Sequence, residues 1–289
     1  DQKICIISDS NVAKLYAETV KNILTKSFPQ IFCYEFQAGG SEQKITDTVN
    51  GVYEFLIQNH FDRHDLMIAL GGGVVGDLTG FTAATYLRGI DFLSRYRLHF
   101  FPRLTAALAA RPAFDFMQYK NMVGAFYQPK LVYMNLNVLK TLPKDQLISG
   151  FGEILKHGLI RNHDYFLWMN EHEKEILALD YNTLEEMVYQ SCLIKRDVVE
   201  RDPKEKGERA LLNFGHTIGH AVEKLSDFGL SHGVCVGLGM VAASYISCQQ
   251  GNLTKEQLSF IEETLKHFGL LIRVSGQNPD DVLRTTKLD

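Results

Sequence analysis

Three histidines and a glutamate have the types and spacing of a metal site. His216 and His220 are four residues apart in NFGHTIGH, so a helix would place both on one face, and His232 follows twelve residues later. Glu153 lies on an earlier segment with helical periodicity. One carboxylate with two or three imidazoles suits a divalent cation that keeps a coordination position open. Spacing alone favours both His216 and His220 as ligands; the alternative is that one of them is a hydrogen-bonded histidine beside the site or in the core.

A run of glycines offers a second kind of chemistry. GGGVVGD, from Gly71 to Asp77, stands where a short hydrophobic strand should turn into a helix. Glycines let the backbone approach a phosphate closely, and the N-terminus of a helix presents unpaired N–H groups and the positive end of its dipole. The spacing differs from G-x-G-x-x-G, so an ordinary dinucleotide-binding motif is only weakly indicated. A tight turn that binds nothing is the alternative.

Basic residues stand beside both motifs. Most surface lysines and arginines are simply solvated, so each one alone carries little information. Together with a glycine turn and a metal site, however, they would suit a substrate that carries phosphate or carboxylate groups. The candidates are Arg88, Lys120, Lys156, Lys195 and Arg209.

The first half of the chain must position the glycine run, and it alternates strands with helices. Short β-rich runs at 3–8, 31–36, 66–70 and 131–135 predict strands, and apolar residues at helical spacing predict helices over 12–24 and 45–57. Alternation of this kind predicts a parallel, Rossmann-like α/β sheet with crossover helices.

Beyond Pro143 the pattern becomes entirely helical. Six segments carry helical periodicity without a convincing strand between them: 145–160, 164–178, 182–200, 209–224, 233–250 and 255–268. We therefore expect an α/β domain at 1–140 and an all-α domain, which binds metal and substrate, at 141–289. A cleft between two domains is the default place for a site.

Composition excludes several classes of protein. The chain has 289 residues, of which 45% are hydrophobic and 22% charged, as in globular domains. Its net charge of −4 implies no broad cationic face, so we do not expect a nucleic-acid partner. No apolar run approaches the roughly 20 residues that span a membrane, and we expect no signal peptide. Five cysteines without a C-x-x-C pair predict free thiols and a cytoplasmic location.

Several blocks resemble one enzyme family. GGGVVGDLTGFTAATYLRG, KNMVGAFYQP, TLPKDQLISGFGEILKHGLI and GERALLNFGHTIGHAVE are similar, in order, to 3-dehydroquinate synthase. The resemblance implies a cytoplasmic homodimeric lyase that depends on NAD and on Zn²⁺ or Co²⁺. It would convert 3-deoxy-D-arabino-heptulosonate 7-phosphate, a phosphorylated seven-carbon sugar acid, to 3-dehydroquinate and inorganic phosphate in the shikimate pathway of aromatic amino-acid and chorismate biosynthesis.

The same resemblance implies a role for each matching residue. The metal ligands would be Glu153, His216 and His232, so His220 becomes a substrate-side or proton-relay residue, against the prediction from spacing alone. The residues that would bind the cofactor are Asp9, Asn11, Lys44, Gly72, Gly73, Val74, Val75, Gly76, Asp77, Lys120, Val138, Leu139, Lys140 and Thr141. The residues that would bind the substrate and take part in catalysis are Arg88, Asn121, Lys156, Lys195, Arg209, Asn213 and His220.

One internal segment departs from the family. Between Phe92 and Met117 the family reads approximately V-P-T-T-L-L-x-Q-V-D-S-S-x-G-G-K-T-G, whereas this chain has SRYRLHFFPRLTAALAARPA. Suitable codons for residues 96–113, read from the third base, encode P-T-T-L-L-S-Q-V-D-S-S-I-G-G-K-T-G. We therefore hypothesise two compensating frameshifts around residues 94–114, in the gene or in its sequencing. As written, Leu104 and Arg111 stand near the positions of the family's acid and lysine. We also expect the chain to be truncated at both ends relative to the family.

Three other functions remain open from the sequence. Another sugar-phosphate cyclase, such as 2-deoxy-scyllo-inosose synthase, would share the glycine and metal motifs. A metal-dependent polyol dehydrogenase would oxidise its substrate without releasing phosphate. A catalytically impaired NAD- or metal-binding relic would be consistent with the altered segment. Phosphate release without net NADH separates a cyclase from a dehydrogenase, and binding without turnover identifies a relic.

Overall fold

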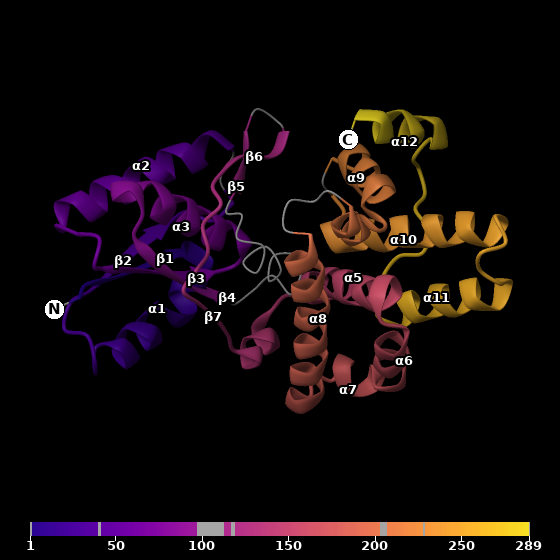
Figure 1. Cartoon of the computed structure of the whole chain (residues 1–289), viewed down its shortest axis with the longest axis horizontal. Helices are drawn as coiled ribbons and strands as arrows, with labels where there is room; N and C mark the ends of the chain where they lie inside the picture. The colour runs from indigo at the N-terminus through magenta and orange to yellow at the C-terminus, as the bar shows by residue number, and fades with distance from the viewer. Residues whose placement is uncertain are drawn as a thin grey trace. The chain divides into compact units, whose positions relative to one another are not determined.

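The computed structural model describes residues 2–39, 42–96, 113–116, 119–202, 207–227 and 229–288, with the backbone alone at 42–45, 95–96, 113–116, 119–122 and 288 (Figure 1). The chain divides into two compact units, the first running to Asn135 and the second beginning at Leu136. The domain boundary expected near residue 140 stays a prediction.

A five-stranded parallel sheet forms the centre of the first unit. Its order is β2-β1-β3-β4-β7, and every neighbouring pair is parallel, which confirms the predicted α/β class. The strands are β1 (Ile4–Asp9), β2 (Ile31–Phe36), β3 (Leu66–Gly71), β4 (Asp91–Tyr96) and β7 (Leu131–Met134). A separate antiparallel pair consists of β5 (Ala113–Phe116) and β6 (Tyr119–Gly124). We did not predict β4, β5 or β6.

Helices cover both faces of the sheet. They are α1 (Ser10–Leu24), α2 (Glu42–Gln58), α3 (Gly73–Thr85) and the 3₁₀ turn η1 (Tyr86–Arg88). Successive side chains of a strand point to opposite faces, so Ile4 and Ile6 pack in the cluster that contains α1 residues, while Cys5 and Ile7 pack with residues of α2 and α3. Figure 1 shows α1 on one face and α2 with α3 on the other. Burial on both faces explains why β1 is apolar without alternation.

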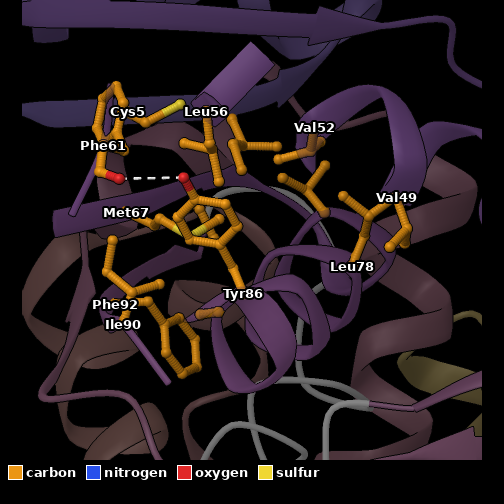
Figure 2. Packing of buried hydrophobic residues seen from close by; sticks show 14 residues of the cluster. Cys5, Val49, Val52, Leu56, Phe61, Met67, Leu78, Tyr86, Ile90 and Phe92 are labelled. Carbon is orange, nitrogen blue, oxygen red and sulfur yellow. Dashed lines mark hydrogen bonds between the residues drawn. The ribbon is translucent and has the colours of Figure 1, made fainter. Parts of the chain in front are cut away.

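The larger cluster of the first unit also buries a tyrosine. Figure 2 shows Tyr86 among Leu56, Met67 and Phe92, with its hydroxyl donating to the Phe61 carbonyl at 3.0 Å. Fully burying one side chain of this size contributes about 1.5–3 kcal/mol. The hydrogen bond satisfies the one polar atom that the tyrosine side chain brings into this cluster.

The winding of the sheet reverses between β1 and β3. The chain leaves β1 outward to β2 and returns to β3 on the other side of β1. Asp9 ends β1 and Gly71 ends β3, while Ser8 Oγ donates to the Leu70 carbonyl at 2.7 Å across the two strands. In parallel α/β sheets, ligands bind at the carboxyl ends of the strands at such a reversal. The fold therefore puts the glycine run beside Asp9, where a ligand is expected.

The second unit is helical throughout its described residues, as predicted. Its elements are η2 (Leu136–Thr141), α5 (Lys144–Arg161), α6 (His163–Glu171), α7 (Glu173–Leu177), α8 (Tyr181–Arg201), η3 (Glu208–Asn213), α9 (His216–Leu225), α10 (His232–Gln249), α11 (Lys255–His267), α12 (Pro279–Thr285) and η4 (Thr286–Leu288). In the part of the chain that the structure describes, no helix is long and apolar enough to cross a membrane.

Two of the predicted helices are wrong in extent. The segment 164–178 divides at His172, which leaves helical geometry with φ −102° and ψ 20° between α6 and α7. The segment 209–224 divides into η3 and α9 because Gly215 takes φ +80°, a left-handed conformation that glycine adopts at little cost. This break makes His216 the first residue of α9, with its Nδ1 3.3 Å from the Phe214 carbonyl oxygen.

Candidate functional site

Close packing of helices brings the predicted metal ligands together. Glu153 lies on α5, His216 begins α9 and His232 begins α10. Next to His232, Gly233 lies so near α5 that a Cβ there would stand 1.7 Å from the Ser149 carbonyl oxygen, and its N–H donates to Ser149 Oγ at 3.0 Å. A residue without a side chain is thus required for α10 to start this close to α5, and the approach places His232 beside Glu153.

Glu153 Oε1 faces both histidines. It lies 3.4 Å from His216 Nε2 and 3.6 Å from His232 Nε2. Bonds of about 2.0–2.1 Å to a tetrahedral Zn²⁺ set neighbouring ligand atoms about 3.4 Å apart. This carboxylate oxygen is buried and, among the described residues, has no hydrogen-bond partner. A buried acceptor without a partner is costly, so the three residues fit a divalent ion that would satisfy Oε1.

His220 joins the same group. The ligand atoms of His216, His220 and His232 all lie within 4.8 Å of one another, and the His220 ring centroid is 5.3 Å from that of His216. The structure therefore brings together every histidine that the sequence singled out. Ligation by His220, favoured by spacing, and a role on the substrate side, implied by the resemblance, both stay predictions.

Positive groups around Glu153 keep its buried carboxylate ionised. Its second oxygen, Oε2, is 2.5 Å from Lys156 Nζ, and both side chains are buried. Burial alone would raise the pKa of Glu153, but Lys156, His232 and His216 hold it well below its usual range. Lys156 therefore occupies Oε2 and leaves Oε1 facing the histidines.

The two predicted histidine ligands, His216 and His232, have opposite pKa shifts. Burial and the charge of Lys156 lower the pKa of His216 to about 3, so its ring is neutral and has a lone pair for a metal. Burial also acts to lower the pKa of His232, but the nearby carboxylates of Glu153 and Glu223 outweigh it and raise the value to about 9. His232 is thus held between two carboxylates, one on each side of its ring.

Further cations surround this group. Burial, followed by the charges of Lys156 and Arg209, lowers the pKa of Lys195 to about 7. Arg209 is buried on η3, and Asn213 is exposed at the end of that helix. Like charges that oppose one another within a partly buried site are relieved by an anion. Binding of phosphate or carboxylate by Lys156, Lys195 and Arg209 stays a prediction, with which these charges are consistent.

Two residues of this site were not predicted. Glu223 Oε2 lies 3.2 Å from His232 Nδ1, and its position on the helix face of His216 and His220 was a signal available in the sequence. His157 is buried one turn after Glu153, with Nδ1 2.5 Å from the Ser191 hydroxyl of α8. Burial, and then Lys156, hold the pKa of His157 well below its usual value, so this pair joins α5 to α8 as neutral groups.

The first unit holds the other predicted site. Asp9 Oδ1 accepts from the backbone N–H groups of Asn11 and Val12 at 2.9 and 3.0 Å and so caps α1. Gly72 caps α3 without a side chain, and the exposed Val74 follows in its first turn. Both helices therefore begin at the reversal point of the sheet, and their N-termini favour an anion such as a pyrophosphate. Cofactor binding by Asp9, Asn11 and the residues from Gly72 to Asp77 stays a prediction.

Arg88 has a strained backbone. Leu87 and Arg88 take φ of 50° and 66°, left-handed values that cost a residue with a side chain about 1–2 kcal/mol. The Arg88 side chain is exposed on the first unit. Such strain often marks a functional position, so Arg88 remains a candidate for substrate binding.

The remaining candidates are spread over both units. Val138 and Leu139 are buried in η2 of the second unit, where Lys140 and Thr141 are exposed. Lys44 lies on α2 and Lys120 and Asn121 on β6, where the structure describes the backbone alone. Leu104 and Arg111 lie outside the described residues, as does most of the segment 94–114. The frameshift hypothesis therefore stays untested.

Solved structures share the fold. That of 2-deoxy-scyllo-inosose synthase, complexed with carbaglucose-6-phosphate, NAD⁺ and Co²⁺, superposes with a TM-score of 0.81 at 24% identity, covering 100% of this chain and 78% of that chain. At this identity the likeness shows the fold alone. The alternative of a 2-deoxy-scyllo-inosose synthase is therefore not favoured over the relatives that match the sequence itself.

Those relatives agree with one another. The 3-dehydroquinate synthase of Acetivibrio thermocellus is 40% identical over 280 residues, which cover 97% of this chain and 77% of that protein. The 3-dehydroquinate synthase of Ruminiclostridium cellulolyticum is 38% identical over the same shares of the two chains. The family model for the 3-dehydroquinate synthase N-terminal region matches residues 35–149, and that for its C-terminal region matches 150–289. With both regions matched in order along nearly the whole sequence, this chain belongs to the 3-dehydroquinate synthase family.

Proposed function

We propose that this chain performs the reaction of its family at the site built from Glu153, His216 and His232. The enzyme converts 3-deoxy-D-arabino-heptulosonate 7-phosphate to 3-dehydroquinate and inorganic phosphate, and it depends on NAD and on a divalent metal. The observation that carries the residue assignment is the buried Glu153 Oε1, which faces two imidazole nitrogens at 3.4 and 3.6 Å and has no hydrogen bond among the described residues.

When bound, NAD would supply a hydride acceptor, and the metal would supply a Lewis acid that polarises a substrate hydroxyl. For the metal, Zn²⁺ or Co²⁺ suits one carboxylate and two imidazoles. For the dinucleotide, the N-termini of α1 and α3 at the reversal point of the sheet support Asp9, Asn11 and the residues from Gly72 to Asp77 as the binding loop. Lys44, Lys120 and residues 138–141 complete the proposed cofactor set by family resemblance.

The chain's own cations bind and orient the substrate. Lys156 holds Glu153 Oε2 and so fixes the direction of Oε1. With its pKa lowered to about 7, Lys195 Nζ exchanges its proton near neutral pH, and an anionic substrate would restore its charge. Arg209 offers a planar guanidinium for a phosphate or carboxylate. Arg88, Asn121, Asn213 and His220 complete the proposed substrate set by family resemblance.

Assembly and location follow from the same family. We propose a homodimer that works in the cytoplasm on a phosphorylated sugar acid. The net charge of −4 supports a partner other than nucleic acid. Light scattering on the purified chain would measure the assembly, and a monomeric mass at working concentration would overturn the dimer.

A phosphate-release assay tests the function. The chain as written is compared with a version that carries P-T-T-L-L-S-Q-V-D-S-S-I-G-G-K-T-G in place of residues 96–113, both with NAD and Co²⁺. We expect the second version to release one phosphate per substrate without net NADH, and the first to be at least about 100-fold slower, because it lacks the family's acid and lysine in that segment.

Other outcomes would identify the rival functions. NADH that accumulates without phosphate release would identify a polyol dehydrogenase. Binding of NAD, measured by isothermal titration, without turnover in the second version would identify a relic. Equal rates for the two versions would remove the reason for the frameshift hypothesis.

A further inference from the structure

We infer that Glu223 is a positioning residue of the metal centre, whose carboxylate holds the His232 ring so that Nε2 faces the ion. The inference rests on the proposed ligand set of Glu153, His216 and His232. Glu223 is the last residue of the GERALLNFGHTIGHAVE block, and the roles assigned to that block did not include it.

The ring of His232 is bracketed by carboxylates from two helices. Glu223 on α9 places Oε2 3.2 Å from Nδ1, and Glu153 on α5 places Oε1 3.6 Å from Nε2. An ionised carboxylate only accepts hydrogen bonds, so Nδ1 must carry the proton in the contact with Glu223. An imidazole that binds a metal ion is neutral and carries one proton on its nitrogens, so the contact with Glu223 leaves the lone pair for the ion on Nε2, on the side of Glu153 and His216.

The two carboxylates have different surroundings. Glu153 is bound through Oε2 by Lys156, which leaves Oε1 for the ion. Glu223 is also buried, with 7% of its surface exposed, and it turns toward Nδ1, the ring nitrogen on the side away from Glu153. Burying a carboxylate is costly unless it is paired, and the hydrogen bond to the His232 ring provides such a pairing.

Helix packing keeps Glu223 within reach of the ring. A Cβ at Gly219 would lie 2.8 Å from the Cys235 carbonyl oxygen, so α9 and α10 are in close contact there. Gly219 lies one turn before Glu223, and Cys235 lies one turn after His232. His216, at the start of the same α9, lies two turns before Glu223. One helix therefore supplies both a ligand and the group that orients a second ligand, and its displacement would affect both.

A carboxylate on the remote nitrogen of a metal-bound histidine fixes the ring orientation and raises the basicity of the coordinating nitrogen. Loss of such a partner typically weakens metal affinity about 10- to 100-fold. A role limited to joining α9 and α10 would instead lower the thermal stability of the metal-free protein and leave its metal affinity unchanged. The two roles therefore differ in a quantity other than activity.

Cobalt binding to the full chain provides the test. Metal-free protein is titrated with Co²⁺ in competition with a chromophoric chelator, and the visible absorption of the bound Co²⁺ is recorded for Glu223→Gln and Glu223→Ala. We expect about 10- to 100-fold weaker affinity and an altered Co²⁺ spectrum in both. The smaller loss is expected for the glutamine, because its amide oxygen keeps an acceptor at the same reach. The exposed Glu263 on α11 gives a matched control, Glu263→Gln, which should match the unchanged chain.

A second control separates this inference from the ligand assignment. Glu153→Ala should lose tight Co²⁺ binding; if it does and both Glu223 variants bind like Glu263→Gln with an unchanged spectrum, Glu223 has no positioning role. If Glu153→Ala itself keeps its affinity, the proposed metal site fails first. Lower thermal stability of the Glu223 variants with unchanged affinity also overturns the inference. Should Glu223→Ala fail to fold, the isosteric Glu223→Gln decides.

Discussion

Replacing Gly233 by alanine should separate two of the proposed metal ligands, His232 and Glu153, without changing either residue. The Cβ of an alanine at this position would stand 1.7 Å from the Ser149 carbonyl oxygen, and the nearby atoms are backbone rather than a flexible side chain. Gly233 directly follows His232, and Ser149 lies one turn before Glu153. Relief of the clash must therefore move the start of α10 away from α5.

The size of this movement follows from the contact. Because a normal contact of this kind is at least 3.0 Å, the two backbones would have to part by about 1.3 Å. Metal sites tolerate deviations of only about 0.2 Å in ligand distances. Overpacking of a helix contact costs about 1–3 kcal/mol, and a clash between backbones belongs at the upper end of that range. At roughly 2–4 °C per kcal/mol for a unit of this size, Tm should fall by about 6–12 °C.

A glycine on the same helix gives the control. A Cβ at Gly237 would lie 3.5 Å from Leu270 Cβ, which is an ordinary contact, so Gly237→Ala should be neutral or stabilise α10 by up to about 1 kcal/mol. Both variants are purified, loaded with Zn²⁺, dialysed and assayed for bound zinc and for Tm. We expect Gly233→Ala to lose zinc and stability and Gly237→Ala to keep both.

Two outcomes for the zinc content and Tm of Gly233→Ala and Gly237→Ala would contradict this prediction. Equal zinc content and equal Tm in the two variants would mean that α5 and α10 do not approach as closely as the structure has them. A lower Tm with full zinc content would mean that the strain is relieved elsewhere on α10, so that the glycine contact does not set the distance between His232 and Glu153.

Three further predictions concern single side chains. Glu153→Ala leaves Lys156 as a buried cation without its partner, so stability should fall by about 3–5 kcal/mol in urea unfolding; an unchanged midpoint would contradict the buried pair. Lys195→Met should raise the Tm of the metal-free protein, because the folded state lowers the pKa of Lys195 from 10.5 to about 7 and so opposes its charged form. The gain should be largest below pH 7 and shrink between pH 7 and 10.5, where only the unfolded chain keeps this proton, and a gain independent of pH would refute the argument. Tyr86→Phe removes the hydrogen bond to the buried Phe61 carbonyl and should cost the first unit about 1–2 kcal/mol, measured by its urea midpoint; a midpoint equal to that of the unchanged chain would show that the bond adds nothing.

Most strands of the sheet could be predicted from sequence, but β4 could not. The run from Ile4 to Ile7 is apolar without alternation, which is typical of a parallel strand covered on both faces. In contrast, β4 has the same length as β1 but carries the charged residues Asp91 and Arg95, which interrupt an apolar run. It is a strand because β3 and β7 pair with it on either side. Such pairing between distant segments cannot be predicted from the periodicity of one segment.

The site divides in the same way. The motifs named Glu153, His216 and His232 through the family resemblance, whereas spacing alone favoured His216 with His220. Glu223 was overlooked, although it shares a helix face with two of the histidines. Its contact with His232 arises only where α9 and α10 cross.

The sequence by itself determined the family, the alternation of strands and helices, and the supply of one acid, three imidazoles and several cations. Only the tertiary structure decided which atoms meet: Oε1 of Glu153 facing two Nε2 atoms, with Lys156 on its other oxygen. Periodicity records the environment of neighbouring residues along one segment. Distances between helices, and the pKa shifts that depend on them, are set by how closely whole backbones can pack, and here glycines without side chains set that limit.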